Sequence, residues 1–517
     1  MPIQIESARA RAAACFAAGA VMALGQPPFG LWPLTLLGAA LIFSLWPREA
    51  GRPGFWFGWR VGFGYFVVAL HWIVEPFFVD IAAHGWIAPF ALVILPGGMA
   101  LFWGAAFALA AWLSRRRNAG PRQAAAALVL FWSLAEFTRS YIFTGFPWAL
   151  PVYIWTDTPV AQISAWIGPY GLTLLTLALG GFAGTTLSRA SLFRFAPAGA
   201  SLAIVAALWA LGAARAPEAD APADAPVIRV VQTAVDQETK WDLENVESNF
   251  AMLLEFSTAP AREEPAVIVW PESAVTFPID MSENARERIG ESLGDASLAL
   301  GSLRMDGGPA QEITPASRWR NSLFLLGDDG EAQAIFDKIH LVPFGEYFPF
   351  DDFVRSLGVI GLGSYGGGIV PGDAPVLMSP ENAPPFAPLI CYEMIFAKET
   401  MAASEGASWM ALVTNDGWFG GWAGPAQHLA MAQFRAIETG LPIARSANQG
   451  VSAMIDPYGR ATIAAAAGEA GFVDAALPRP SSPTLYRRFG DFFTTLMLCG
   501  LLALSTIGVN RRKLSEN

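Results

Sequence analysis

The sequence has little charge for its length. Charged residues make up 15% of the 517 residues and hydrophobic residues 53%, whereas soluble domains typically carry about 25% charged residues. The 44 acidic residues outnumber the 33 basic ones, for a net charge of −11. A phosphate-binding face needs clustered Lys and Arg, so this balance argues against nucleic acid as a partner. The shortage of charge indicates that much of the chain faces lipid.

Cysteine and histidine are scarce. Cys15 and Cys499 lie in apolar segments near the two ends, and Cys391 stands alone in a more polar region. A structural disulfide needs two thiols in one aqueous domain, so none is expected. The four histidines do not have the spacing of metal ligands. We therefore predict neither a metal site nor another cofactor.

Long apolar stretches are abundant instead. Eight have roughly the length that spans a membrane: residues 12–25, 31–46, 55–74, 86–113, 124–134, 159–187, 192–211 and 492–509. They predict a membrane domain of about seven transmembrane helices over residues 1–213 and a last transmembrane helix over residues 490–510.

Basic residues follow alternate apolar stretches, with Arg139 as the exception. Arg115–Arg117 and Arg122 follow the fourth stretch, and Arg511–Lys513 follow the last. Because short cytoplasmic loops collect Lys and Arg, the pattern predicts that both termini are cytoplasmic. The region between the seventh and eighth stretches then lies outside the cytoplasm.

The hydrophobic pattern changes after a linker, residues 214–226, that is rich in Ala, Pro and Asp. Short buried strands are predicted at residues 227–235, 266–270, 297–303, 322–326, 388–391 and 409–414. Helices are predicted at residues 243–256, 283–293 and 426–437. Strands alternating with helices indicate a layered α/β domain over residues 227–480.

Three reactive side chains follow apolar strands in this domain: Glu272, Lys338 and Cys391. A free thiol has a pKa of roughly 8.5, so the nucleophilic thiolate is a minority species at neutral pH. A neighbouring carboxylate can take the thiol proton, and a fixed cation can stabilise the oxyanion that forms. The set therefore predicts nucleophilic catalysis by Cys391, with Glu272 as the base and Lys338 at the oxyanion.

The order Glu, Lys, Cys resembles the catalytic set of the nitrilase (carbon–nitrogen hydrolase) superfamily. Within it, the sequence resembles the apolipoprotein N-acyltransferases over nearly the whole chain. The matching stretches are 240–241, 321–322, 341–347, 391–393, 414–420, 427–428, 435–438 and 448–450, with 136, 139 and 145–148 in the membrane part.

This resemblance implies an αββα sandwich on the periplasmic side of a bacterial inner membrane. It implies transfer of an acyl group from a phospholipid, through a Cys391 thioester, to the amine of a diacylated lipoprotein. It also implies supporting roles for Trp241, Glu346, Tyr392, Glu393, Asn415 and Trp418. Two readings stay open: the two tryptophans also suit core positions, and Asn415 also suits an ordinary turn.

Two other functions compete with acyl transfer. One is a membrane-tethered amidase that uses the same three residues with water as the acceptor. Such an enzyme needs no multi-span anchor, which counts against it. The other is a non-catalytic membrane scaffold, which the intact Glu, Lys and Cys disfavour.

Overall fold

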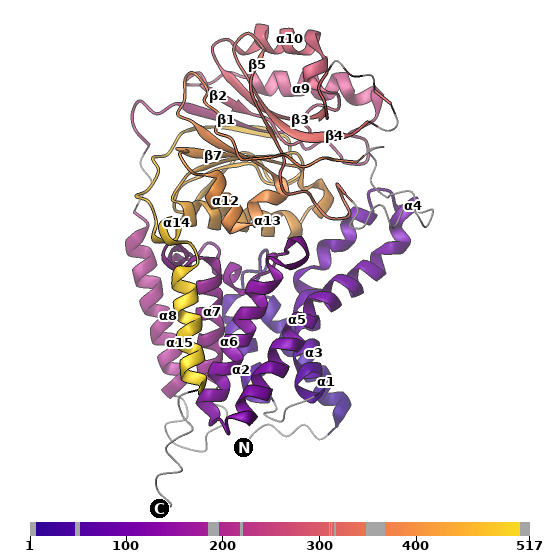
Figure 1. The fold of residues 1–517 in the computed structure, drawn as a ribbon. Coiled ribbons are helices and arrows are strands. Elements are labelled where there is room, and N and C mark those ends of the chain that lie inside the picture. Colours follow the sequence, from indigo (N-terminus) through magenta and orange to yellow (C-terminus); the bar gives the residue numbers. More distant parts are fainter. Residues whose placement is uncertain are drawn as a thin grey trace, which may run out of the picture. The chain divides into compact units, whose positions relative to one another are not determined.

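The computed structural model describes residues 7–46, 52–184, 196–217, 221–309, 311, 313–314, 317–347 and 368–506. The chain divides into two compact units. One, the helical unit, comprises Met1–Pro217 with Pro483–Asn517, and the other, the sheet unit, comprises Glu218–Ser482. Figure 1 shows the elements of both.

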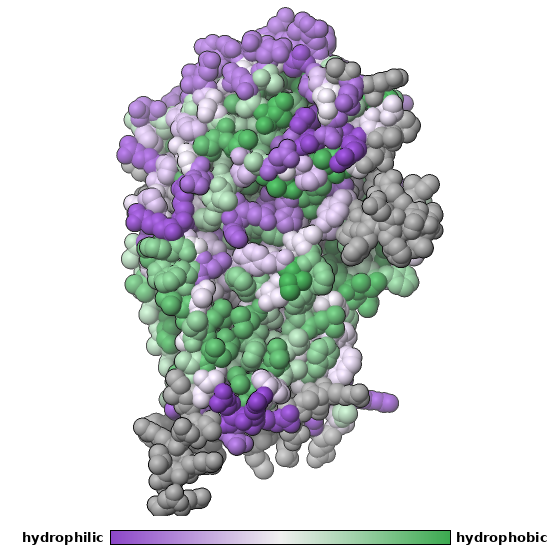
Figure 2. Space-filling view, viewed as in Figure 1, coloured by the Kyte–Doolittle hydropathy of each residue, from purple (hydrophilic) through white to green (hydrophobic). Residues whose placement is uncertain are grey.

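The helical unit contains a helix at each of the eight predicted stretches. These helices are α1 (Ala8–Ala23), α2 (Trp32–Leu45), α3 (Arg52–Ala69), α5 (Ala88–Arg116), α6 (Pro121–Arg139), α7 (Ser164–Gly184), α8 (Ala196–Arg215) and α15 (Phe492–Thr506). The ends of three predicted stretches, residues 185–187, 192–195 and 507–509, lie outside the described residues. Figure 2 shows that apolar residues cover most of the visible surface of these helices.

Fewer helices than predicted are long and apolar enough to cross a membrane. Within the described residues there are three: Ile81–Arg116, Pro159–Gly184 and Ala196–Arg215. A fourth results if α3 and the 3₁₀-helix η1 (His71–Phe77), bent by 53° relative to each other, form one span. Helices α2 and α15 are apolar but shorter. The count of about eight spans therefore remains a prediction.

Helix α6 extends beyond the predicted stretch 124–134 because its charges are paired. Arg139 Nη2 lies 2.7 Å from Glu136 Oε2, and both side chains are buried. Trp103 donates to Glu136 Oε1 at 2.5 Å, and Arg139 donates to the carbonyls of Phe146 and Trp148. A buried ion pair with every group hydrogen-bonded is tolerated where an isolated charge is not.

The sheet unit is built on two sheets. The six-stranded sheet has the order β11-β1-β2-β3-β4-β5, with β1 (Val227–Gln232), β2 (Val267–Val269), β3 (Ser297–Met305), β4 (Trp319–Leu326), β5 (Ala332–Asp337) and β11 (Gly471–Ala476). The five-stranded sheet has the order β10-β9-β8-β7-β6, with β6 (Phe386–Ile390), β7 (Trp409–Thr414), β8 (Ile443–Ala447), β9 (Ala453–Ile455) and β10 (Ala461–Ile463). Strands β1–β3 are parallel, as are β6–β8.

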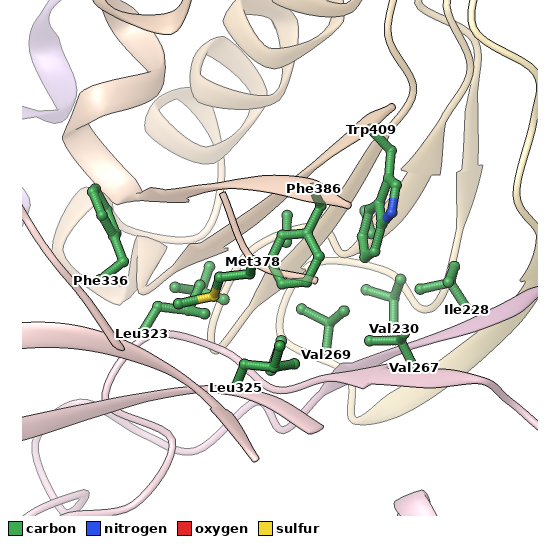
Figure 3. Close-up of a cluster of buried hydrophobic side chains, with 14 of the residues drawn as sticks. Ile228, Val230, Val267, Val269, Leu323, Leu325, Phe336, Met378, Phe386 and Trp409 are labelled. Atoms are coloured by element: carbon green, nitrogen blue, oxygen red, sulfur yellow. The ribbon is translucent and has the colours of Figure 1, made fainter. Parts of the chain in front are cut away.

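Apolar side chains fill three layers. Between the sheets, Val230 and Val269 pack with Phe386 and Trp409 (Figure 3). The other face of the six-stranded sheet packs on α9 (Val246–Ser257) and α10 (Glu283–Leu293), and that of the five-stranded sheet packs on α13 (Ala423–Thr439). Strands buried on both faces read as continuous apolar runs. The order of layers is helix, sheet, sheet, helix, as expected for a nitrilase-like sandwich.

Three predicted strands run past the ends of the observed strands: residues 227–235 past β1 at Gln232, residues 266–270 past β2 at Val269, and residues 388–391 past β6 by one residue. Strand β6 ends at Ile390, and Cys391 starts the 3₁₀-helix η9 (Cys391–Ile395) with φ of 50°. The prediction of a strand at residues 388–391 was based on a run of apolar residues. Such a run does not show where the backbone changes direction.

Candidate active site

The ends of three strands bring Glu272, Lys338 and Cys391 together. Glu272 lies in the turn after β2, Lys338 follows β5, and Cys391 follows β6, on the other sheet. Lys338 Nζ is 3.5 Å from Glu272 Oε1, and the charges of both groups act on the thiol of Cys391. The exposed fractions are 7%, 1% and 5% in chain order, so the interactions among these groups are little screened by water.

The carboxylate of Glu272 is held by donors on both oxygens. Asn321 Nδ2 donates to Oε1 at 2.7 Å, and the backbone N–H of Asn415 donates to Oε2 at 2.9 Å. Gly301 on β3 allows the turn to approach, because a Cβ there would lie 2.6 Å from the Cα of Glu272. The side chain is thus fixed in one orientation while remaining able to accept a proton.

The ammonium of Lys338 lies between two carboxylates. Its Nζ donates to Glu346 Oε1 at 3.0 Å and to Glu272 Oε1 at 3.5 Å. Burial alone would lower the pKa of Lys338, but attraction to Glu346 and Glu272 outweighs it and holds the pKa above its ordinary value. Lys338 therefore stays cationic, as an oxyanion partner must.

Cys391 has an unusual backbone and a weakly acidic thiol. A φ of 50° is uncommon for a residue with a Cβ, and such conformations cluster at functional sites. Burial, followed by the negative charge of Glu272, raises the pKa of the Cys391 thiol well above its ordinary value, although Lys338 opposes the shift. The thiol is therefore protonated at neutral pH, and a nucleophilic role would require a base to accept its proton.

Two further acidic residues of the predicted set, Glu346 and Glu393, accept hydrogen bonds from the segments that carry Lys338 and Cys391. Glu346 accepts from Lys338 and from the N–H of Val342 at 2.8 Å. Glu393 is 4% exposed and links the two sheets: it accepts from the N–H of Ile339, after β5, and of Ile390, at the end of β6, both at 2.8 Å. Burial raises the pKa of Glu393 to about 7, although the N–H groups that donate to its carboxylate oppose this shift.

The remaining predicted residues differ in exposure. Tyr392 is buried and packs edge-on against Phe396, with ring centroids 5.1 Å apart. Asn415 accepts from Asn448 Nδ2 at 3.2 Å through the oxygen of its side chain. Trp241 and Trp418 are 37% and 40% exposed. These values disfavour the reading of the two tryptophans as core anchors.

The sequence assigned no role to Lys240 or Asn321, although both lie in stretches that carry the family resemblance. Asn321 Nδ2 joins the two carboxylates by donating to Glu272 and, at 2.9 Å, to Glu346. Lys240 is 2% exposed and donates to the backbone carbonyl of Glu272 at 3.3 Å. Their position in those matching stretches was the signal that the sequence offered.

No group of three His, Cys, Asp or Glu side chains in the described part of the chain is placed to hold a metal ion. The arrangement of Glu272, Lys338 and Cys391 has the groups that covalent catalysis by a thiol requires: a nucleophile, a base and a cation.

Two stacked sheets between helices, with a buried carboxylate, lysine and cysteine at the strand ends, are the features of a carbon–nitrogen hydrolase-like domain. Residues 227–484 match the carbon–nitrogen hydrolase family, and residues 18–182 match the family of the apolipoprotein N-acyltransferase N-terminal domain. A solved amidase of the nitrilase superfamily from Nesterenkonia is 16% identical and covers 53% of this chain and 99% of its own, with a TM-score of 0.38.

Relatives match over the whole length. The apolipoprotein N-acyltransferase of Rhodopseudomonas palustris is 35% identical over 96% of this chain and 94% of its own. The apolipoprotein N-acyltransferase of Brucella suis is 37% identical over 96% of this chain and 95% of its own. The chain therefore belongs to the apolipoprotein N-acyltransferase family.

Proposed function

We propose that this protein is an apolipoprotein N-acyltransferase. It moves an acyl chain from a phospholipid, through a thioester on Cys391, to the N-terminal amine of a diacylglyceryl-cysteine lipoprotein. The observation that carries the proposal is the buried Cys391 thiol, on which the charges of Glu272 and Lys338 both act, in a chain that matches apolipoprotein N-acyltransferases over 96% of its length.

In the first half-reaction, the sulfur of Cys391 attacks the ester carbonyl of the phospholipid and its proton passes to Glu272. Lys338 stabilises the tetrahedral oxyanion together with the backbone N–H of Tyr392. The carbon–oxygen bond of the ester then breaks, Glu272 returns its proton to the leaving alkoxide, and lysophospholipid departs. The acyl group remains on sulfur as a thioester.

In the second half-reaction, the neutral α-amine of the lipoprotein attacks the thioester. Glu272 accepts a proton from the amine, the carbon–sulfur bond breaks, and the proton returns to the thiolate of Cys391. An amide is formed and the free enzyme is restored. Water in place of the amine would give hydrolysis, which is the amidase alternative.

The helical unit gives this chemistry its location. Both substrates are lipids, and helices that are long and apolar enough to cross a membrane keep the chain in the bilayer. We propose that residues 1–213 and 490–510 contribute about eight spans in the bacterial inner membrane. Residues 227–480 then form the catalytic domain on the periplasmic side, after the linker 214–226.

One assay separates the possible functions. The purified full chain is incubated in detergent with a phospholipid that carries a labelled acyl chain and with a diacylated lipopeptide. Acyl transfer gives a labelled amide on the lipopeptide. Labelled free fatty acid without amide would identify a hydrolase, and the absence of turnover would identify a non-catalytic scaffold.

A further inference from the structure

A buried polar network contacts the backbone of Cys391 from the side of helix α13. His428 Nε2 lies 3.3 Å from the carbonyl oxygen of Cys391, and His428 Nδ1 lies 2.9 Å from Asp416 Oδ1. Arg445 on β8 donates to Asp416 Oδ2 at 2.5 Å. Each of these three side chains is fully buried, with 0% of the residue exposed. None of them belongs to the three residues that carry the reaction.

The hydrogen-bond chemistry fixes where protons must lie. A carbonyl oxygen can only accept, so His428 Nε2 carries the proton that it donates to Cys391. Burial would raise the pKa of Asp416, but the charges of Arg445 and His428 outweigh it and hold that pKa well below its ordinary value. Asp416 is therefore an anion that lies 2.9 Å from Nδ1, and Arg445 Nη2 lies 3.2 Å from the same nitrogen.

This contact acts on one particular peptide group. The carbonyl of Cys391 and the N–H of Tyr392 belong to the same planar unit, so fixing the oxygen fixes the direction of the N–H. A donor on the carbonyl also polarises the amide and strengthens its N–H as a donor. The backbone needs such support, because φ of 50° at Cys391 is a strained conformation for a residue with a side chain.

We propose that His428 is a positioning residue for acyl transfer: held by Asp416, it donates to the Cys391 carbonyl and thereby aims the N–H of Tyr392 at the oxyanion. The inference rests on the proposed function, since it assigns that N–H as the second oxyanion donor beside Lys338. His428 touches no reacting atom and acts through the peptide that follows the nucleophile.

Two substitutions separate positioning from simple packing. In His428→Gln, the amide nitrogen lies as many bonds from Cα as His Nε2, so the donor to Cys391 is retained and the contact with Asp416 is lost. In His428→Asn, the amide nitrogen corresponds to Nδ1, so the contact with Asp416 is retained and the donor to Cys391 is lost. Gln433→Ala is a matched control, because Gln433 is a buried residue of the same helix that donates to a different carbonyl, that of Gly459, at 2.9 Å.

The measurement is the single-turnover rate of acyl-enzyme formation from labelled phospholipid in detergent, with the rate of thiol alkylation by iodoacetamide and the Tm of each variant. We expect His428→Asn to acylate on the order of ten- to a hundredfold more slowly than the wild type, the scale for a misaimed oxyanion donor. We expect His428→Gln to recover most of this loss, and alkylation to change less than about threefold in both variants.

Equal acylation rates in the Gln and Asn variants, or rates that only follow Tm as in Gln433→Ala, would overturn the positioning role. A fall in alkylation as large as the fall in acylation would overturn it too, because alkylation of a thiol needs no oxyanion donor. If the wild type itself forms no acyl-enzyme, the proposed function fails instead, and this result is distinguishable from any difference among the variants.

Discussion

At the scale of single residues, the charged groups of the site share their hydrogen-bonding partners. Glu272 and Glu346 share one cation, Lys338, and one amide, that of Asn321. Because these contacts hold Glu272 in place, a substitution that keeps its shape isolates its charge. The base and the oxyanion cation can therefore be tested separately.

Glu272→Gln and Lys338→Ala should each lower phospholipid turnover on the order of a hundredfold or more, the usual scale for a lost base or oxyanion group. The measurement is the initial rate of labelled lysophospholipid release, with Tm recorded for each variant. Glu331→Gln serves as the control, since that carboxylate is 65% exposed. Near-normal turnover in a folded variant would remove that residue from the catalytic set.

Lys240 gives the site a pH-dependent stability. Burial lowers its pKa to about 8, and Glu272 opposes the shift. Between pH 8 and about 10.5 the unfolded chain keeps the Lys240 proton that the folded chain has lost, so the contribution of Lys240 to stability should rise with pH across this window. The raised pKa of the Cys391 thiol contributes in the opposite direction. Lys240→Met should therefore make the slope of Tm against pH less positive than in the wild type, whereas Lys398→Met, at an exposed position, should leave the slope unchanged. Identical slopes in the Lys240 variant and the wild type would contradict the buried state of this amine.

At the scale of elements, regular apolar runs were the predictable part of the fold. Strand β7 and helix α10 have the bounds that the sequence predicted, residues 409–414 and 283–293. Strands β5 and β8 were missed for opposite reasons. β5 carries exposed residues, and β8 contains Arg445, whose burial depends on a partner, Asp416, that is distant in sequence. Hydrophobic periodicity cannot register a charge that is neutralised by tertiary contact.

The same limit applies to the site. The sequence predicted Glu272, Lys338 and Cys391 as a catalytic set because their types and order resemble a known set. It gave no role to Asn321, since an amide that joins two carboxylates becomes visible only when β2, β4 and the segment after β5 are brought together. The 50° φ of Cys391 was also out of reach, because residue type alone does not specify it.

The close contact between strand β3 and the turn that carries Glu272 predicts that a side chain added to β3 disturbs this turn. A Cβ at Gly301 would lie 2.6 Å from Glu272 Cα and 2.7 Å from the Pro271 oxygen. Gly301→Ala should therefore displace the turn, lower stability by about 1–3 kcal/mol and lower turnover at least about tenfold. Gly199→Ala is the control, since its Cβ would meet nothing within 4 Å. Unchanged turnover in Gly301→Ala would show that the turn tolerates displacement.

At the scale of the whole molecule, helix length and the apolar stretches of the sequence give different numbers of membrane spans. Within the described residues, three or four helices meet the length and composition of a span, whereas the apolar stretches of the sequence predict about eight. A reporter fused within residues 214–226 should register outside the cytoplasm, and one fused within residues 115–122 should register inside. Registration of both on one side would mean that the number of spans between them is wrong.

The central claim is that the acyl group rests on Cys391 between the two substrates. Intact-protein mass spectrometry after incubation with phospholipid alone tests it most directly. We predict one acyl adduct per chain, released by neutral hydroxylamine and lost on addition of diacylated lipopeptide, and none in Cys391→Ala. An adduct that persists in Cys391→Ala, or lipopeptide acylation in which no acyl-enzyme can be trapped, would contradict covalent catalysis at this residue.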